Sequence, residues 1–111
     1  MNQEQFPISN CNFYDMTVAI GATIHDGRTA QDVMVSLMSE VGELAEEVNI
    51  QYSTRNSYKT PGADGVVGEG IDVILCVMDL LHISNPELTH EELMRLAALK
   101  LQKWYNKSHG I

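Results

Sequence analysis

Two pairs of acidic residues constrain this chain more than any other feature, because each pair lies in a stretch with helical periodicity. Glu40 and Glu43 lie in the segment S-E-V-G-E-L-A-E-E-V, and Glu69 and Asp72 lie in the segment G-E-G-I-D-V-I-L. Side chains three residues apart are neighbours on one face of an α-helix. Two such helices packed side by side would therefore bring four carboxylates together.

Clustered carboxylates repel one another and oppose folding unless a cation lies between them. Ligands that are all oxygen suit Mg²⁺ or Mn²⁺ better than Zn²⁺. The pattern thus predicts a metal site formed by Glu40, Glu43, Glu69 and Asp72. From spacing alone, the alternative is that these acids are the solvated faces of two ordinary amphipathic helices.

Hydrophobic periodicity divides residues 1–111 into four predicted helices within one domain. The first begins near residue 10 and ends near 24, and the second and third are expected at about 30–51 and 66–83. The fourth follows Asn85 and runs to about residue 107. Thr29 and Thr89 each begin a plausible capping box. An N-terminal arm at 1–9 and a turn-rich loop at 53–65 complete an all-α fold that resembles a four-helix bundle.

The third predicted helix is apolar around most of its circumference, and its acids Glu69, Asp72 and Asp79 form a single line. A helix that is apolar on all sides is buried on all sides. Four helices from one small chain would struggle to cover it completely. We therefore expect a second copy of the chain to cover part of its surface.

Basic residues lie in two places where they could meet a phosphate. Lys100, Lys103 and Lys107 follow the apolar stripe of the last helix to its end, from which they could reach over the acidic site. Arg55 and Lys59 lie in the turn-rich loop, and long loops in compact domains are often functional. The alternatives are that the lysines complement the helix dipole without a ligand, and that the loop residues are ordinary solvated surface.

Net charge and apolar patterning argue against several classes of function. A net charge of −8 and a pI near 4.7 disfavour binding to nucleic acid or to an anionic membrane surface, which needs a basic footprint. A negatively charged substrate would then need a bridging metal. No apolar run is long enough to span a bilayer, and the first residues lack the pattern of a signal peptide. With Cys11 and Cys76 interpreted as reduced thiols, we expect a cytoplasmic protein.

The two acidic motifs also carry a family resemblance. The order E-x-x-E, spacer, E-x-x-D, with E-V-G-E-L-A-E around the first pair, resembles the MazG-type nucleotide pyrophosphohydrolases of the all-α NTP pyrophosphatase superfamily, over about residues 32–107. This resemblance implies a homodimer or homotetramer that hydrolyses a nucleoside or deoxynucleoside triphosphate to the monophosphate and pyrophosphate with Mg²⁺. It also implies that the lysines of the last helix bind phosphate.

Two positions depart from the family pattern, and two residues are candidates for the catalytic base. Ser39 stands where fuller MazG motifs have a leading glutamate, and Trp104 stands where an asparagine is expected. A carboxylate not fully committed to the metal would accept the proton of the attacking water; Glu43 is the first candidate and Glu47 the second. The alternative function is a non-catalytic helical dimer that acts as a regulatory or partner-binding module.

Overall fold

The structure, a computed structural model, describes residues 12–24, 27–52 and 59–111. These residues form four helices and no strand: α1 (Phe13–Gly21), α2 (Ala30–Tyr52), α3 (Gly65–Ser84) and α4 (His90–Ser108). The all-α prediction is confirmed, and the predicted ends of α2 and α3 are close to the observed ones. None of these described helices has the length and apolar character needed to cross a bilayer. The predicted N-terminal arm at 1–9 lies outside the described residues.

Side-chain caps fix where three of the helices begin. The Thr29 backbone N–H donates to the Asp32 carboxylate at 3.0 Å, and the Asp32 N–H donates back to the Thr29 hydroxyl at 3.2 Å, which completes the predicted capping box of α2. The Thr89 hydroxyl accepts the N–H of Glu92 at 3.1 Å before α4. Asn12 caps α1, so this helix begins at residue 13, later than the sequence predicted.

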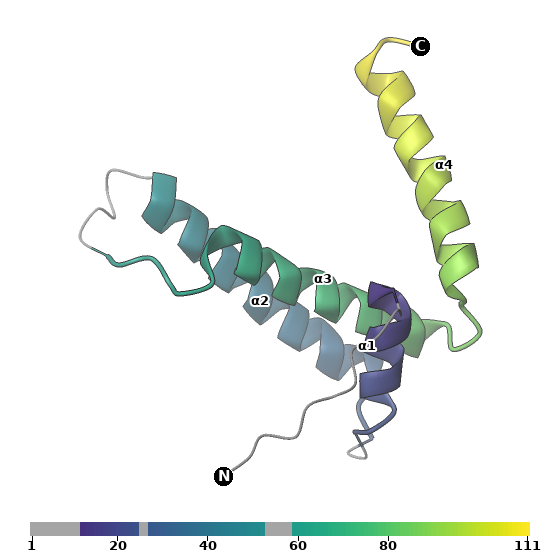
Figure 1. The fold of residues 1–111 in the computed structure, drawn as a ribbon, viewed down its shortest axis with the longest axis horizontal. Coiled ribbons are helices and arrows are strands. Elements are labelled where there is room, and N and C mark those ends of the chain that lie inside the picture. The colour runs from purple at the N-terminus through teal and green to yellow at the C-terminus, as the bar shows by residue number, and fades with distance from the viewer. Residues whose placement is uncertain (1–11, 25–26, 53–58) are drawn as a thin grey trace.

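Helices α2 and α3 form an antiparallel pair, and α1 packs across the C-terminal half of α3 (Figure 1). Tyr14 anchors α1, because its hydroxyl donates to the Leu88 carbonyl at 2.9 Å and its ring lies edge-on against His82. Tyr14 and Val33 are the buried apolar side chains among the residues that the structure describes. The hydrophobic core within a single chain is therefore small.

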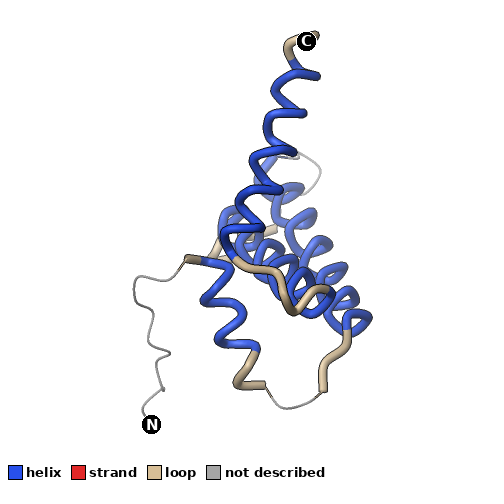
Figure 2. The backbone as a smooth tube through the Cα atoms, turned by 90° about the vertical axis from the view of Figure 1, so that its right-hand side faces the viewer, coloured by secondary structure: helices blue, strands red, loops and turns tan. Residues whose placement is uncertain are grey.

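Helix α4 leaves this body at a steep angle and makes almost no contact with the other three helices (Figures 1 and 2). The four helices of one chain thus do not close into the bundle that the sequence suggested. As a result, no residue of α3 is fully buried, and Val67 remains 75% exposed. The expectation that α3 is buried nearly all round is not met within one chain, because α4 does not cover it.

Candidate metal centre

Packing of α2 against α3 brings the four predicted carboxylates to one place. Carboxylate oxygens of Glu40, Glu43 and Glu69 lie within 4.8 Å of one another, and so do those of Asp64, Glu69 and Asp72. Because Glu69 belongs to both groups, the five residues form one continuous group. We call Glu40, Glu43, Asp64, Glu69 and Asp72 the acidic cluster.

The apolar stripe of α2 determines where its acids point. Val33 is buried, Leu37 and Leu44 are half-buried, and Glu40 lies between the two leucines along the helix. At 3.6 residues per turn, Glu40 falls close to the direction that these apolar residues share. Glu43 is one turn further along and exposed. Burial of the stripe against α3 therefore draws the first acidic pair toward the second.

Asp64 is a member of the acidic cluster that the sequence analysis missed. It precedes α3 at the N-cap position, yet its side chain makes no capping hydrogen bond. Gly68 allows Asp64 to occupy this place, since a Cβ atom at position 68 would lie 2.1 Å from the Asp64 Cβ. Positions 64, 68 and 72 are four residues apart and share one line of the helix. The spacing D-x-x-x-G-x-x-x-D carries this signal, but the turn-rich loop predicted at 53–65 includes residue 64.

Within residues 12–24, 27–52 and 59–111, no basic side chain forms an ion pair with the acidic cluster. The Oε2 atoms of Glu40 and Glu69 are buried and have no hydrogen-bond partner in the described part of the chain. Desolvation, followed by repulsion from Glu43 and Asp72, raises the pKa of Glu40, and the same causes raise the pKa of Glu69. Buried oxygens without partners destabilise a fold unless a ligand satisfies them. A divalent cation with oxygen ligands would do so.

Glu47 has a different environment from Glu43. It is 5% exposed, and its two carboxylate oxygens accept the backbone N–H of Gly62 at 3.0 and 3.1 Å. This bond ties the segment before α3 to α2, and so supports the position of Asp64 within the acidic cluster. Glu43, by contrast, is exposed. Within the described residues, its carboxylate accepts no hydrogen bond from a backbone N–H.

Among the residues that the structure describes, the lysines predicted to bind phosphate make no ion pair with the acidic cluster of their own chain. Lys100, Lys103 and Lys107 are exposed on α4, which projects away from α2 and α3. The Nζ atom of Lys59 lies 3.4 Å from the Oε1 atom of Glu46, an acid outside the cluster. Arg55 lies outside the described residues.

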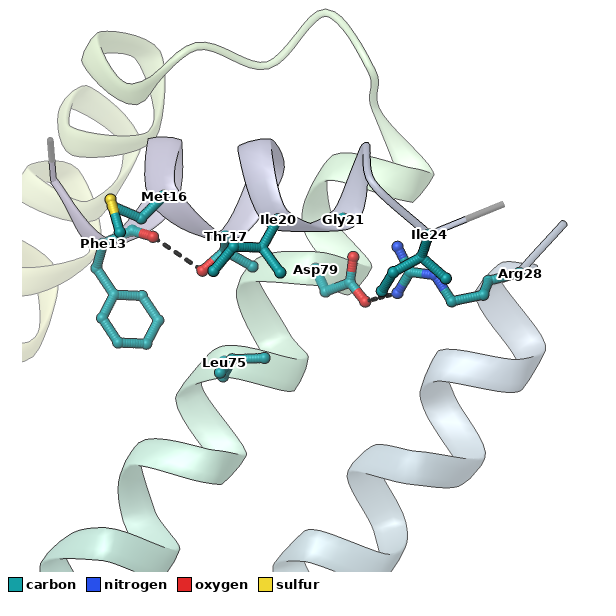
Figure 3. Close-up of a pocket in the computed structure, with 9 residues that line it drawn as sticks. All are labelled: Phe13, Met16, Thr17, Ile20, Gly21, Ile24, Arg28, Leu75 and Asp79. Atoms are coloured by element: carbon teal, nitrogen blue, oxygen red, sulfur yellow. Dashed lines mark hydrogen bonds and ion pairs between the residues drawn. The ribbon is translucent and has the colours of Figure 1, made fainter. Parts of the chain in front are cut away.

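An apolar pocket of about 450 Å³ lies between α1 and α3 (Figure 3). Asp79 forms an ion pair with Arg28 in its wall. Leu75 also lines the pocket and follows Asp72 by three residues, about one helical turn, although no member of the acidic cluster itself lines the pocket. The apolar stripe predicted for the first helix supplies much of the remaining wall: Phe13, Met16, Thr17, Ile20 and Ile24.

The acidic cluster offers the oxygen ligands that a divalent cation needs, and the apolar pocket lies on the same helix α3. Comparisons of the chain with models of known protein families, with curated proteins and with solved structures found no match. The MazG resemblance therefore stays a prediction that rests on the two acidic motifs.

Proposed function

We propose that this chain is a Mg²⁺-dependent pyrophosphohydrolase of nucleoside or deoxynucleoside triphosphates, which produces the monophosphate and pyrophosphate. One observation carries the proposal: five carboxylates converge between α2 and α3, and the buried Oε2 atoms of Glu40 and Glu69 lack partners. A site with only oxygen ligands suits Mg²⁺, or Mn²⁺ as a substitute. The choice of reaction and of the bond between the α and β phosphates comes from the MazG resemblance.

Within this proposal the carboxylates have separate roles. When bound, the cation would neutralise phosphate oxygens and lower the pKa of a coordinated water. Glu40, Glu69 and Asp72 would hold it, since they are the half-buried members of the acidic cluster. Glu43 is exposed and would accept the proton of the attacking water. Glu47 would fix the segment before α3 through Gly62.

The apolar pocket supports a substrate that joins an anionic tail to a ring. Its volume of about 450 Å³ falls within the usual range for small-molecule sites. Leu75 in its wall lies one helical turn after Asp72 of the acidic cluster, and the charged groups of Arg28 and Asp79 offer polar contacts in a mostly apolar wall. A nucleoside triphosphate has both parts, with its base suited to the pocket and its phosphates to the metal.

The test is pyrophosphate release from a panel of canonical and modified nucleoside triphosphates with Mg²⁺. We expect the parent to release pyrophosphate, and Asp72→Asn to lose about a hundredfold or more of this activity. Glu46→Gln is the matched control, because Glu46 lies on α2 but outside the acidic cluster. Absence of release from every nucleotide, with Mn²⁺ tried as well, would overturn the proposal.

The exposed surface of α4 favours a second candidate function, that of a non-catalytic regulatory or partner-binding module. Thermal unfolding separates the two candidates, because ligands that bind the native state raise its melting temperature. An enzyme should be stabilised by Mg²⁺ and further by Mg²⁺ with a nonhydrolysable nucleotide. A binding module of this kind should not respond to the nucleotide.

A further inference from the structure

Glu47 is a buried carboxylate that belongs to neither group of converging oxygens. It follows Glu40 by seven residues, so the two side chains lie within about 20° of each other on α2, about two turns apart. Carboxylates are almost never buried unless a partner compensates them. An apolar side chain at this position would extend the apolar stripe of α2 without that penalty. Packing alone therefore does not explain a glutamate here.

The partner of Glu47 is the backbone of Gly62, in the segment that leads into α3. Both carboxylate oxygens accept the Gly62 N–H, at 3.0 and 3.1 Å. The Gly62 carbonyl in turn accepts the N–H of Gly65 at 3.3 Å, which joins the two ends of the bend that contains Asp64. A Cβ atom at position 62 would lie 3.3 Å from the Glu47 Oε2 atom, so a glycine permits this close approach. We call the contact between Glu47 and Gly62 the Glu47 clasp.

The Glu47 clasp is stronger than the ion pair that also joins this segment to α2. In that pair the side chains of Lys59 and Glu46 are 41% and 61% exposed. Exposed ion pairs stabilise a fold little, because water screens them. A hydrogen bond to a charged group that is shielded from water is stronger. Loss of the clasp should therefore release the segment from α2, even with the ion pair intact.

Asp64 lies two residues after Gly62, and its own side chain does little to hold it in place. It is exposed and makes no capping hydrogen bond. Its carboxylate nevertheless lies within 4.8 Å of those of Glu69 and Asp72. Desolvation, followed by repulsion from neighbouring acids that include Asp64, raises the pKa of Glu69, so this approach is opposed in the absence of a cation. The clasped bend holds Asp64 there against that repulsion.

We propose that Asp64 is a further ligand of the cation and that Glu47 is a positioning residue, which presents Asp64 through Gly62 without touching the cation. The proposal rests on the metal site of the proposed function, but not on the reaction. Because coupling between two binding events is reciprocal, the bound cation would also hold the Glu47 clasp closed. The segment before α3 would then be held more firmly in the metal-bound protein than in the metal-free protein.

Two substitutions at position 47 separate positioning from direct ligation. A glutamine oxygen can accept the Gly62 N–H, so Glu47→Gln keeps the clasp and should keep nearly the parent affinity for Mn²⁺. Leucine is apolar and accepts no hydrogen bond, so Glu47→Leu should bind Mn²⁺ about tenfold more weakly. Glu46→Leu makes the same change at the exposed neighbour and should bind like the parent. Electron paramagnetic resonance of free Mn²⁺ measures all four affinities.

Either of two results in this series would overturn the proposal. Equal losses in Glu47→Gln and Glu47→Leu would show that the charge of Glu47 acts on the cation directly. Parent affinity in Glu47→Leu would show that the clasp does not matter for metal binding. Far-UV circular dichroism checks that each variant stays helical.

A double substitution tests whether Glu47 acts through Asp64. Asp64→Asn alone should weaken Mn²⁺ binding by about tenfold or more. Adding Glu47→Leu to it should cause no further loss, because both changes remove the same ligand from the site. Losses that multiply in the double variant would show that the two residues act independently, which contradicts the proposal.

Hydrogen exchange at Gly62 tests the reciprocal effect of the metal on the segment. In the ¹⁵N-labelled parent, saturating Mg²⁺ should slow exchange of the Gly62 amide by about tenfold, the same factor by which the clasp favours metal binding. Asp64→Asn should show no such slowing. Unchanged exchange in the parent, or equal slowing in both proteins, would refute the coupling.

The same measurements distinguish failure of the clasp from failure of the proposed reaction, since none of them needs a nucleotide. A parent that binds Mn²⁺ and shows the expected variant pattern, but releases no pyrophosphate, would refute the reaction and leave the role of Glu47 standing. A parent that releases pyrophosphate, with Glu47→Leu binding Mn²⁺ as tightly, would refute the role of Glu47 alone. A parent that binds no Mn²⁺ would overturn both.

Discussion

The acidic cluster and α4 carry charged residues at similar helical spacing, but they differ in what packs against them. On α2 and α3 the apolar stripes pack together, and the acids beside those stripes converge within 4.8 Å of one another. On α4 the lysines stay exposed, because none of the other described helices covers the apolar residues beside them. The spacing of charged residues determines which face of a helix they share. They converge into one site only where a neighbouring helix packs beside that face.

The largest expected effect comes from an exposed acid of the cluster. Glu43→Gln removes the carboxylate that we assign as the proton acceptor, and kcat should fall by about 10²–10⁴-fold. Glu46→Gln removes an exposed acid of the same helix outside the cluster and should leave kcat near the parent value. Steady-state pyrophosphate release measures both variants. Equal kcat values in the two variants would show that membership of the cluster does not matter for catalysis.

A smaller effect is expected from the glycine that makes room for Asp64. Gly68→Ala would place a Cβ atom 2.1 Å from the Asp64 Cβ, so the backbone at one of these residues must shift, and the free energy of unfolding should fall by about 1–3 kcal/mol. Gly70→Ala is the control in the same helix, since a Cβ atom there meets nothing within 4 Å. It should raise the free energy of unfolding by about 0.5–1 kcal/mol. Urea denaturation without metal measures both, and a harmless Gly68→Ala would mean that Asp64 does not depend on this gap.

The smallest effect is a pH dependence of the metal-free protein. The pKa values of Glu40 and Glu69 are raised in the folded state, so protonation of these groups favours folding. Stability should therefore rise as the pH falls from about 7 toward about 4.5, near the ordinary glutamate pKa. Asp32 and Glu92 have lowered pKa values, and their contribution is lost only at lower pH.

Melting temperatures recorded across this pH range, with and without Mg²⁺, measure the effect. Bound Mg²⁺ should compensate the ionised carboxylates and reduce the gain that acidification gives. A melting temperature that falls steadily from pH 7 downward in the metal-free protein would contradict the raised pKa values.

Much of the fold follows from local signals in the sequence. Apolar periodicity located α2 and α3, and the Thr29 capping box fixed the start of α2 as expected. The spacing of Glu40 from Glu43 was enough to predict that both acids share a face. These features depend on residues within one or two turns of each other, and a single sequence records them directly.

The features that the sequence analysis did not anticipate depend on residues far apart or on a second chain. Glu47 is buried because it accepts the N–H of Gly62, which is fifteen residues away and in a stretch assigned to a loop. Asp64 lies in the same stretch, and its place on the line of Asp72 depends on α3 beginning one turn before Gly68. The direction of α4 is tied to the contact between Tyr14 and Leu88, which no periodic pattern reveals. Amphipathic character shows that α4 needs a partner but does not identify that partner.

Calorimetric titration of Mg²⁺ or Mn²⁺ into the parent protein and into Glu69→Gln tests the central claim, that the acidic cluster is a metal site. Glu69 belongs to both groups of converging carboxylates, so its loss should weaken binding by about a hundredfold or more. Glu46→Gln should bind like the parent. Saturable binding in the parent that Glu69→Gln abolishes is the predicted result. Equal binding by all three proteins, or no binding by the parent, would contradict the account.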